Sequence, residues 1–298
     1  MSLLDFLFAG GRGSAVDDPA CPLCEQPLSW GSACNQCFAP AEVIDSILSR
    51  PGTPHFLGVV GPSGVGKTVY LGMLLDQISR GAGGLTGVAR GPFSLTLQRN
   101  LMLALERQRF PDKTPNEPDR WHWVHAEVSQ GRRRPVFDIV TPDVAGESLM
   151  QEIERPGTYP TILALIARCS GLVVLADTLR VAADGQAQEL FAIQLISYLD
   201  SLRANSRGRV TMPVAIVFTK TDLCDEPIRD IDAFAESNVP ALFRLCRNRL
   251  KTHKFFCSSV AGSTGRIIDQ AGGEMLIPLR IEPRGFIEPF AWLMGQMR

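Results

Sequence analysis

The segment GPSGVGKT, at residues 61–68, carries the most specific chemical pattern in the chain. It fits GxxxxGK(S/T) in full, follows the apolar run FLGVV at 56–60 and opens a stretch in which apolar residues recur at helical spacing. In that context the glycines allow backbone N–H groups and a helix N-terminus to surround a phosphate. Lys67 is then placed to neutralise β and γ oxygens, and the Thr68 hydroxyl to ligate Mg²⁺. The predicted phosphate-binding residues are Gly61, Ser63, Gly64, Val65, Gly66, Lys67 and Thr68.

Four clustered cysteines form the second chemical pattern. Cys21 with Cys24 and Cys34 with Cys37 make two CxxC pairs, separated by nine residues. Four thiolates on two such turns match the tetrahedral coordination of Zn²⁺, and a closed four-sulfur site is structural. An iron site or a redox-active pair is the alternative, although a redox pair does not need a second copy. The remaining cysteines fit no ligand spacing and are expected to be ordinary thiols; they are Cys169, Cys224, Cys246 and Cys257.

A third pattern, DVAG at residues 143–146, follows the apolar run at 135–141. An aspartate at the carboxyl end of a strand beside a phosphate loop can hold a Mg²⁺-bound water, which is the role predicted for Asp143. The N–H of Gly146 can meet a γ-phosphate and move away when that group leaves. DVAG is therefore interpreted as the second half of a magnesium and phosphate site.

Two further motifs point to the base of the nucleotide. TKTD at residues 219–222 places a carboxylate, Asp222, to accept from the N1–H and the 2-amino group of guanine. Adenine lacks these donors, and a buried carboxylate left unpaired is costly, so this site would reject ATP. Lys220 can cover the base with its aliphatic stem. Ser258 and Ser259 open a short polar turn, 258–262, whose N–H can reach guanine O6.

The chain resembles the Ras-like superfamily of P-loop GTPases, within the translation-factor-related class. The resemblance rests on four motifs that occur in the family's order: GPSGVGKT, DVAG, TKTD and SSV. The resemblance covers about residues 55–298. It implies a doubly wound, mostly parallel α/β G domain that binds GTP or GDP with Mg²⁺. By this resemblance Asp222 selects guanine, Ser258 and Ser259 stand for the family's Ser-Ala pair, and Thr219 replaces the more usual Asn. The enlarged length looks like the bacterial double-GTPase type.

One departure from the family pattern lies between the first helix and the strand at 121, where an insertion near 81–120 is expected. The switch threonine, which ligates Mg²⁺ in the triphosphate state, should lie in this segment. Thr114 is predicted for this role because it sits in a polar, Pro-flanked loop before a strand. Thr86 and Thr96 are the competing candidates.

A second departure concerns catalysis. Glu147 occupies the position of the water-orienting Gln of Ras-like proteins. Its carboxylate can position water but adds negative charge beside a γ-phosphate, so slow intrinsic hydrolysis is expected; a surface or helix-capping role is the alternative. The candidate catalytic residues are Lys67, Thr114 and Glu147. No arginine can be assigned to catalysis from the sequence, since Arg120 and the basic run at 132–134 are interpreted as solvated.

Composition divides the chain near residue 50. Residues 1–50 hold two basic and six acidic side chains, a net charge of −4, whereas residues 51–298 have a net charge of +3. We therefore expect a zinc ribbon and a short linker helix (41–49) in residues 1–50, followed by a G domain in residues 51–298. Apolar runs predict strands at 55–60, 121–128, 135–141, 171–177, 214–219 and 253–257. Helical spacing predicts helices near 67–80, 93–109, 186–203, 231–250 and 286–297, with a Gly-rich turn at 81–91.

The overall composition excludes several classes of protein. With 298 residues, 45% apolar and 20% charged, the chain is neither disordered nor a small disulfide scaffold. A net charge of −1 disfavours a basic nucleic-acid binder, and the acidic ribbon favours docking to a protein or self-association. No apolar stretch reaches the length of a membrane helix and no basic segment precedes the apolar start, so a cytoplasmic location is expected.

These inferences converge on a GTP-binding, slowly hydrolysing switch that acts through an unidentified protein effector or activator. A guanine-nucleotide scaffold that does not hydrolyse and a zinc-ribbon adaptor for nucleic acid are the alternatives. Asp222 disfavours an ATPase.

Overall fold

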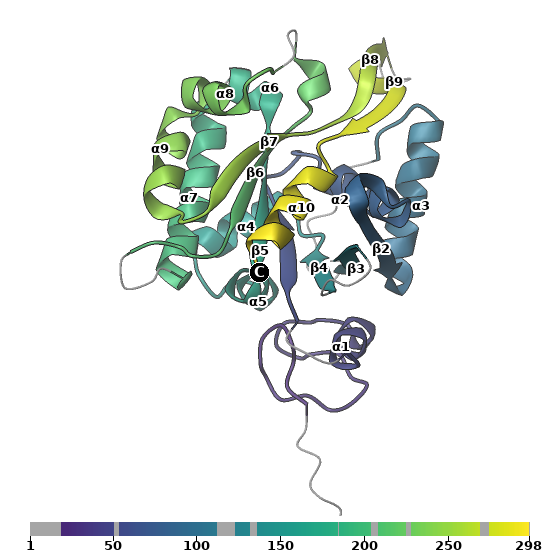
Figure 1. The fold of residues 1–298 in the computed structure, drawn as a ribbon, viewed down its shortest axis with the longest axis vertical. Helices are drawn as coiled ribbons and strands as arrows, with labels where there is room; N and C mark the ends of the chain where they lie inside the picture. The colour runs from purple at the N-terminus through teal and green to yellow at the C-terminus, as the bar shows by residue number, and fades with distance from the viewer. Residues whose placement is uncertain are drawn as a thin grey trace, which may run out of the picture.

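The central feature of the chain is a seven-stranded sheet in the order β2-β3-β4-β1-β5-β6-β7 (Figure 1). A computed structural model describes residues 19–50, 54–111, 123–131, 136–183, 185–203, 208–224, 228–268 and 274–297. All six predicted strands form: β1 (Phe56–Val60), β3 (Trp123–Gln130), β4 (Phe137–Pro142), β5 (Gly171–Asp177), β6 (Val214–Thr219) and β7 (His253–Cys257). Pairing is parallel from β4 through β7 and antiparallel only at β2–β3 and β3–β4.

Helices cover both faces of the sheet, which explains why β1, β4, β5 and β6 are buried at every residue. One face packs against α2 (Lys67–Ser79), α3 (Gly91–Glu106) and α10 (Ile287–Gln296). The other packs against α4 (Gly146–Glu154), α5 (Pro160–Arg168), α7 (Gly185–Arg203), α8 (Ile231–Asn238) and α9 (Pro240–Arg249). Successive strand residues alternate between the two cores, as Val173 and Val174 do. The mostly parallel, doubly wound fold class is therefore confirmed.

Three sequence expectations about the elements are wrong. The segment 81–91 is not only a turn, because a single 3₁₀ turn, η1 (Ala82–Gly84), leads into the edge strand β2 (Leu85–Arg90). The helix expected at 231–250 is two helices, since Val239 leaves helical geometry ahead of Pro240. The polar turn at 258–262 is the start of β8 (Ser259–Ile268), which pairs antiparallel with β9 (Glu274–Arg284).

The N-terminal module is a compact unit that packs on the sheet. It contains α1 (Ala41–Leu48) and an antiparallel bridge between Ala20 and Pro27. Its cysteines and the apolar face of α1 share one core with four residues of the larger part, which are Phe56, Trp123, Val140 and Ala164. Figure 1 shows the module below the sheet, at the opposite end from the β8–β9 hairpin.

Polar contacts reinforce this packing. Ser46 Oγ donates to Glu127 Oε1 at 3.1 Å, and the Arg50 guanidinium pairs with Asp138, which is 1% exposed. Asp138 also lies 2.8 Å from the buried His125 Nε2. The module is thus held by apolar contacts and by a buried polar network.

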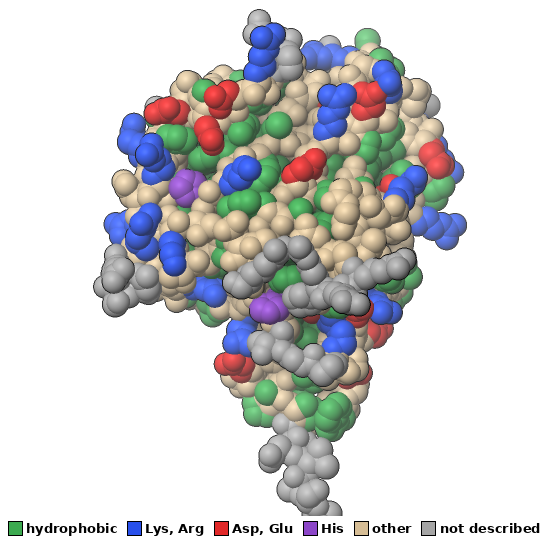
Figure 2. All heavy atoms as spheres, viewed as in Figure 1, with side chains coloured by type: hydrophobic (Ala, Val, Ile, Leu, Met, Phe, Trp, Pro, Cys, Tyr) green, Lys and Arg blue, Asp and Glu red, His purple; other side chains and the backbone are tan. Residues whose placement is uncertain are grey.

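The face shown in Figure 2 carries basic and acidic side chains in mixture over its broad upper body. The N-terminal module forms the narrow lower part of the view. In that module Trp30 and Phe38 are each 63% exposed. Among the described helices, none combines the length and the apolar character needed to cross a membrane.

Candidate functional site

The loop between β1 and α2 adopts the shape that the GPSGVGKT pattern predicts. Gly64 and Gly66 have φ values of +73° and +93°, a left-handed conformation that side chains other than Gly rarely adopt. Gly66 directly precedes α2, so the loop ends at the helix N-terminus. Lys67 is 8% exposed, and its Nζ donates to Gly61 O at 3.2 Å. The loop can therefore surround an anion with its N–H groups and with the ammonium of Lys67.

Thr68 and Asp143, predicted from separate motifs, face each other. Thr68 Oγ1 lies 3.4 Å from Asp143 Oδ1 and 3.3 Å from Oδ2, and Asp143 is 4% exposed. A hydroxyl and a carboxylate at this separation are oxygen donors of the type that Mg²⁺ prefers. These two side chains fit a magnesium ion held beside the phosphate loop.

The DVAG segment also touches the loop directly. Gly146 is the first residue of α4, and a Cβ built on it would lie 2.0 Å from Ser63 N and 2.4 Å from Pro62 C. Only glycine fits this approach between two backbones. Glu147 follows in the first turn of α4, and its half-buried side chain lines the same cavity as the loop.

The candidate switch threonines have different outcomes. Thr114 lies outside the described residues, and its role stays a prediction. Thr86 is in β2, with its hydroxyl 3.2 Å from Ser129 Oγ, and Thr96 lies exposed in α3. Neither of these two competitors lines the cavity.

The TKTD segment is tied to the phosphate loop by two side chains. Thr219 Oγ1 is 2.8 Å from Val65 O and 3.2 Å from Ala176 O, so a threonine hydroxyl makes a link between β6 and the loop. Lys220, at φ +61°, donates from Nζ to Gly64 O at 2.7 Å and to Asp177 Oδ2 at 2.6 Å. A left-handed non-glycine residue costs about 1–2 kcal/mol, which these contacts offset.

Asp222 follows in the 3₁₀ turn η3 (Thr221–Leu223) and lines the cavity. Burial raises the pKa of Asp222 above its ordinary value, and the nearby Lys220 charge opposes this effect. The preceding Thr221 donates from N and from Oγ1 to Ser258 O, at 3.2 and 3.1 Å. These bonds join the two predicted base-recognition segments, although Ser259 belongs to strand β8 rather than to a turn.

The predicted residues surround one cavity of about 490 Å³, a size typical of small-molecule sites. Gly61 and Asp143 stand behind it, whereas the other predicted nucleotide residues line it: Ser63, Gly64, Val65, Gly66, Lys67, Thr68, Gly146, Glu147, Thr219, Lys220, Asp222, Ser258 and Ser259. The lining also includes apolar and aromatic residues that the sequence analysis does not predict, among them Tyr70, Phe110, Leu276 and Phe286. Leu276 comes from the unpredicted β8–β9 hairpin, so no local signal pointed to it.

A further residue that sequence reasoning missed is Arg180, in the short helix α6 (Thr178–Ala183) that follows β5. Its Nη1 donates to Ser63 O at 3.1 Å. Asp177 fixes this helix, because its Oδ1 accepts from Leu179 N at 3.1 Å and from Arg180 N at 3.4 Å. An arginine therefore lies against the phosphate loop.

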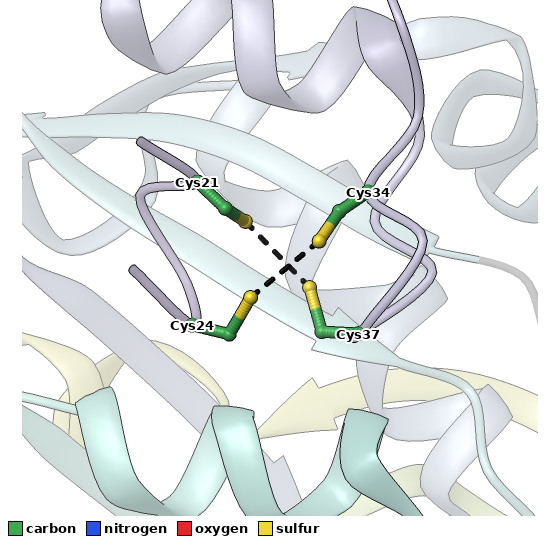
Figure 3. Close-up of side chains that lie close together, drawn as sticks. All are labelled: Cys21, Cys24, Cys34 and Cys37. Carbon is green, nitrogen blue, oxygen red and sulfur yellow. Dashed lines mark hydrogen bonds between the residues drawn. The ribbon is translucent and has the colours of Figure 1, made fainter. Parts of the chain in front are cut away.

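The four clustered cysteines converge as the spacing predicts (Figure 3). Their sulfur atoms all lie within 4.8 Å of one another, at 3.6 Å for Cys21 and Cys37 and 3.5 Å for Cys24 and Cys34. Four Zn–S bonds of about 2.3 Å in a tetrahedron require sulfurs about 3.8 Å apart, whereas a disulfide is about 2.05 Å long. The Cys37 thiol lowers the pKa of Cys21 to about 5, and burial raises the pKa of Cys24 to about 11. The cluster fits a zinc ion, whose charge would stabilise all four thiolates.

The remaining cysteines behave as the spacing analysis expects. Cys169 and Cys246 are buried, and Cys224 and Cys257 are half-buried. Among the described residues, the only group of three or more potential metal ligands whose ligand atoms converge is the Cys21, Cys24, Cys34 and Cys37 cluster.

Comparison with known proteins complements this geometry. No curated protein sequence matches the chain. Similar solved structures include the Arl6 BBS3 small GTPase of Trypanosoma brucei, which is 14% identical with a TM-score of 0.41, covering 82% of this chain and 98% of that one. The GTP-bound GTPase-like domain of S. cerevisiae Ski7 is 14% identical with a TM-score of 0.46, covering 85% of this chain and 52% of that one.

The SRb-GTP/SRX complex of the Chaetomium thermophilum signal recognition particle receptor is 16% identical with a TM-score of 0.40, covering 72% of this chain and 94% of that one. The sequence profile of the Double-GTPase 2 family matches residues 55–266, which is more than half of the chain. The chain therefore belongs to the double-GTPase 2 family of P-loop GTPases.

Proposed function

We propose that this protein is a GTP-binding switch that hydrolyses GTP slowly to GDP and phosphate and exchanges protein partners when the γ-phosphate is lost. Family membership supports GTP binding. The observation that carries the proposal is the convergence of four motifs, spread over residues 61–259, on one cavity. A phosphate loop, a Thr–Asp pair for a cation and a half-buried carboxylate for the base are what a guanine nucleotide with Mg²⁺ requires.

Each group then has a defined task. The loop N–H groups and Lys67 hold the phosphates, and Thr68 with Asp143 holds Mg²⁺. Asp222 accepts from the two guanine donors, while Ser258 and Ser259 stand at the O6 side. The bound nucleotide supplies the phosphoanhydride bond that is hydrolysed.

The expectation of slow turnover rests on Glu147. It lines the cavity and can orient water, but its carboxylate adds negative charge next to the γ-phosphate. Phosphoryl transfer is mostly positioning and charge stabilisation, so such a group limits the rate. Thr114 stays the proposed switch threonine.

The N-terminal fifty residues have a separate proposed role. Cys21, Cys24, Cys34 and Cys37 hold one structural Zn²⁺ in a module of residues 1–50 that precedes, and packs on, the G domain of residues 51–298. The exposed Trp30 and Phe38 and the net charge of −4 favour a protein partner over nucleic acid.

The experiment is isothermal titration of GDP and ADP, followed by single-turnover hydrolysis of labelled GTP. Wild type should bind GDP far more tightly than ADP and hydrolyse GTP at well below 1 per second. Lys67→Ala should abolish binding and turnover, whereas Lys251→Ala, an exposed lysine away from the cavity, should change neither.

A further variant addresses Glu147. Glu147→Gln should preserve or raise the rate, because it removes a negative charge beside the γ-phosphate. Loss of turnover in Glu147→Gln, or a wild-type rate near 1 per second, contradicts the slow-switch proposal. Tight GTP binding without any turnover would instead identify the non-hydrolysing scaffold.

A further inference from the structure

The guanidinium of Arg180 packs against the backbone of the phosphate loop. Nη1 donates to Ser63 O at 3.1 Å, and a Cβ built on Gly64 would be 3.1 Å from Nη2. Ser63 and Gly64 line the nucleotide cavity, so the guanidinium contacts the backbone of a loop that forms its wall. The Arg180 side chain is 54% exposed.

The backbone of Arg180 is fixed while its side chain extends over the loop. Asp177 caps α6 through its Oδ1, and Thr178 Oγ1 donates to Thr219 O at 2.6 Å, which ties the start of the helix to β6. The other carboxylate oxygen of Asp177 makes its close contact with Lys220 Nζ at 2.6 Å and is 3.8 Å from Arg180 Nε. Asp177 therefore anchors the helix and Lys220 without drawing the guanidinium away from the loop.

This position suits one chemical task. An arginine beside the phosphates, supplied within the chain or by a partner, stabilises the charge that develops during phosphoryl transfer. Arginine is suited to this because its planar fork donates several parallel N–H bonds to phosphate oxygens.

We propose that Arg180 is a cis-acting catalytic arginine for GTP hydrolysis, an inference that rests on the proposed function. In this reaction a water oxygen forms a bond to the γ-phosphorus. The bond between that phosphorus and the β–γ bridging oxygen breaks, and its electron pair stays on the GDP oxygen. The proton of the water passes to the phosphate released. Arg180 donates to the oxygens on which negative charge grows.

A purely structural role is the competing explanation. Arg180 would then hold α6 against Ser63 O equally with GDP, with GTP and in the transition state. The two roles differ in what they stabilise, because only a catalytic arginine favours the transition state over the ground state. Ground-state affinity and transition-state affinity must therefore be measured separately.

The test compares wild type, Arg180→Ala, Arg180→Lys and the control Arg80→Ala. Arg80 is an exposed arginine at the end of α2 that pairs with Asp76, outside the cavity lining. Titration of GDP alone and of GDP with aluminium fluoride, a mimic of the transferring phosphoryl group, provides a readout independent of turnover. Single-turnover hydrolysis is measured at several protein concentrations.

Arg180→Ala should bind GDP within about 2-fold of wild type but lose the enhancement by aluminium fluoride. Its hydrolysis should fall from on the order of 10⁻² per second, the value for GTPases with a cis arginine, towards about 10⁻⁴ per second. Arg180→Lys should not restore either property, because lysine lacks the planar fork. Arg80→Ala should match wild type.

Three results would overturn this proposal and leave the proposed function in place. Unchanged hydrolysis and aluminium fluoride binding in Arg180→Ala would leave only the structural role. Loss of GDP affinity in parallel with turnover would mean that Arg180 shapes the loop. A wild-type rate that rises with protein concentration would place the arginine on a second molecule. A wild type that binds GTP without turnover contradicts the proposed function itself, and with it the role of Arg180.

Discussion

The hydroxyl of Thr219 joins β6 to the phosphate loop, and its contribution to stability and to nucleotide affinity can be measured. Thr219 is 5% exposed, and its Oγ1 lies 2.8 Å from Val65 O and 3.2 Å from Ala176 O. The resemblance to Ras-like proteins implies Asn at this position, so the structure explains the replacement: a hydroxyl reaches the loop carbonyl. Thr219→Val keeps the shape and removes this donor.

The expected magnitude follows from one hydrogen bond. A buried hydroxyl bonded to a carbonyl contributes about 0.5–1.5 kcal/mol, so the free energy of unfolding should fall by about 1 kcal/mol. Because the bond holds Val65 within the phosphate loop, the nucleotide must then order the loop itself. A free-energy change of about 1.4 kcal/mol corresponds to about a tenfold change in Kd. The affinity for GDP should therefore fall by roughly 3- to 10-fold. Thr219→Asn, which restores a donor, should recover most of it.

Thr161→Val is the matched control. Thr161 is 3% exposed and its Oγ1 donates to Cys37 O at 2.9 Å, at the N-terminal module rather than at the cavity. Urea denaturation should show a comparable loss of stability in both variants, whereas titration with GDP should show weaker binding only for Thr219→Val. Wild-type affinity in Thr219→Val, or an equal loss in Thr161→Val, would refute the reasoning.

Three more outcomes are expected. Asp222→Asn should weaken GDP binding by about ten- to hundred-fold in titration and leave ADP binding unchanged, because a charged acceptor for two guanine donors is lost. Equal affinities of the wild type for GDP and ADP would contradict the assignment of Asp222. Elemental analysis should find one zinc per chain; iron or no metal would contradict the zinc site. Chelation should remove hydrogen-exchange protection from residues 19–50, while the affinity for GDP stays within about 2-fold of that of the untreated protein. Gly285→Ala should weaken GDP binding at least about tenfold, because its Cβ would lie 1.8 Å from Cys257 O beside Ser258, while Gly131→Ala, with a similar φ of +74° and nothing within 4 Å, should cost stability alone.

The sequence predicts the sheet well because its strands carry their signal locally. Continuous apolar runs such as 214–219 are buried on both faces, which is what a central parallel strand requires. The phosphate loop and the cysteine pairs are equally local, since a few residues specify each turn. For such local features, the separation of residues in the sequence is enough to predict their arrangement in the structure.

The features that were missed depend on tertiary contacts. The short helices α4 and α5 are fixed by Glu152, which is fully buried and accepts from Gly157 N, Tyr159 N and Tyr198 Oη. No local sequence pattern predicts this hydrogen-bond network. The segment 258–262 is interpreted as a short polar turn, whereas Ser259 starts β8, which pairs with β9. Long-range packing, rather than propensity, decides these elements.

Arg180 illustrates the same limit at the candidate site. It lies 117 residues from Ser63 in sequence, and only the order of strands in the sheet brings α6 to the loop. Near the switch segment the sequence offers Arg120 and the run at 132–134. Arg180 comes instead from α6, which follows β5, the strand that neighbours β1 on the side away from β4.

The composition shift near residue 50 does not separate two independent cores. A module of about thirty residues cannot bury enough apolar surface to fold alone. Here it shares its core with Phe56 and Val140, which belong to β1 and β4. Gly61 and Asp143 immediately follow these same strands at their carboxyl ends. The strands β1 and β4 thus connect the cysteine cluster with the cavity. Both strands are buried by the helices of the larger part in addition to the N-terminal module. Loss of the metal should therefore release α1 and the cysteine turns first, because they depend on the cluster, and leave β1 and β4 in place to hold the nucleotide site.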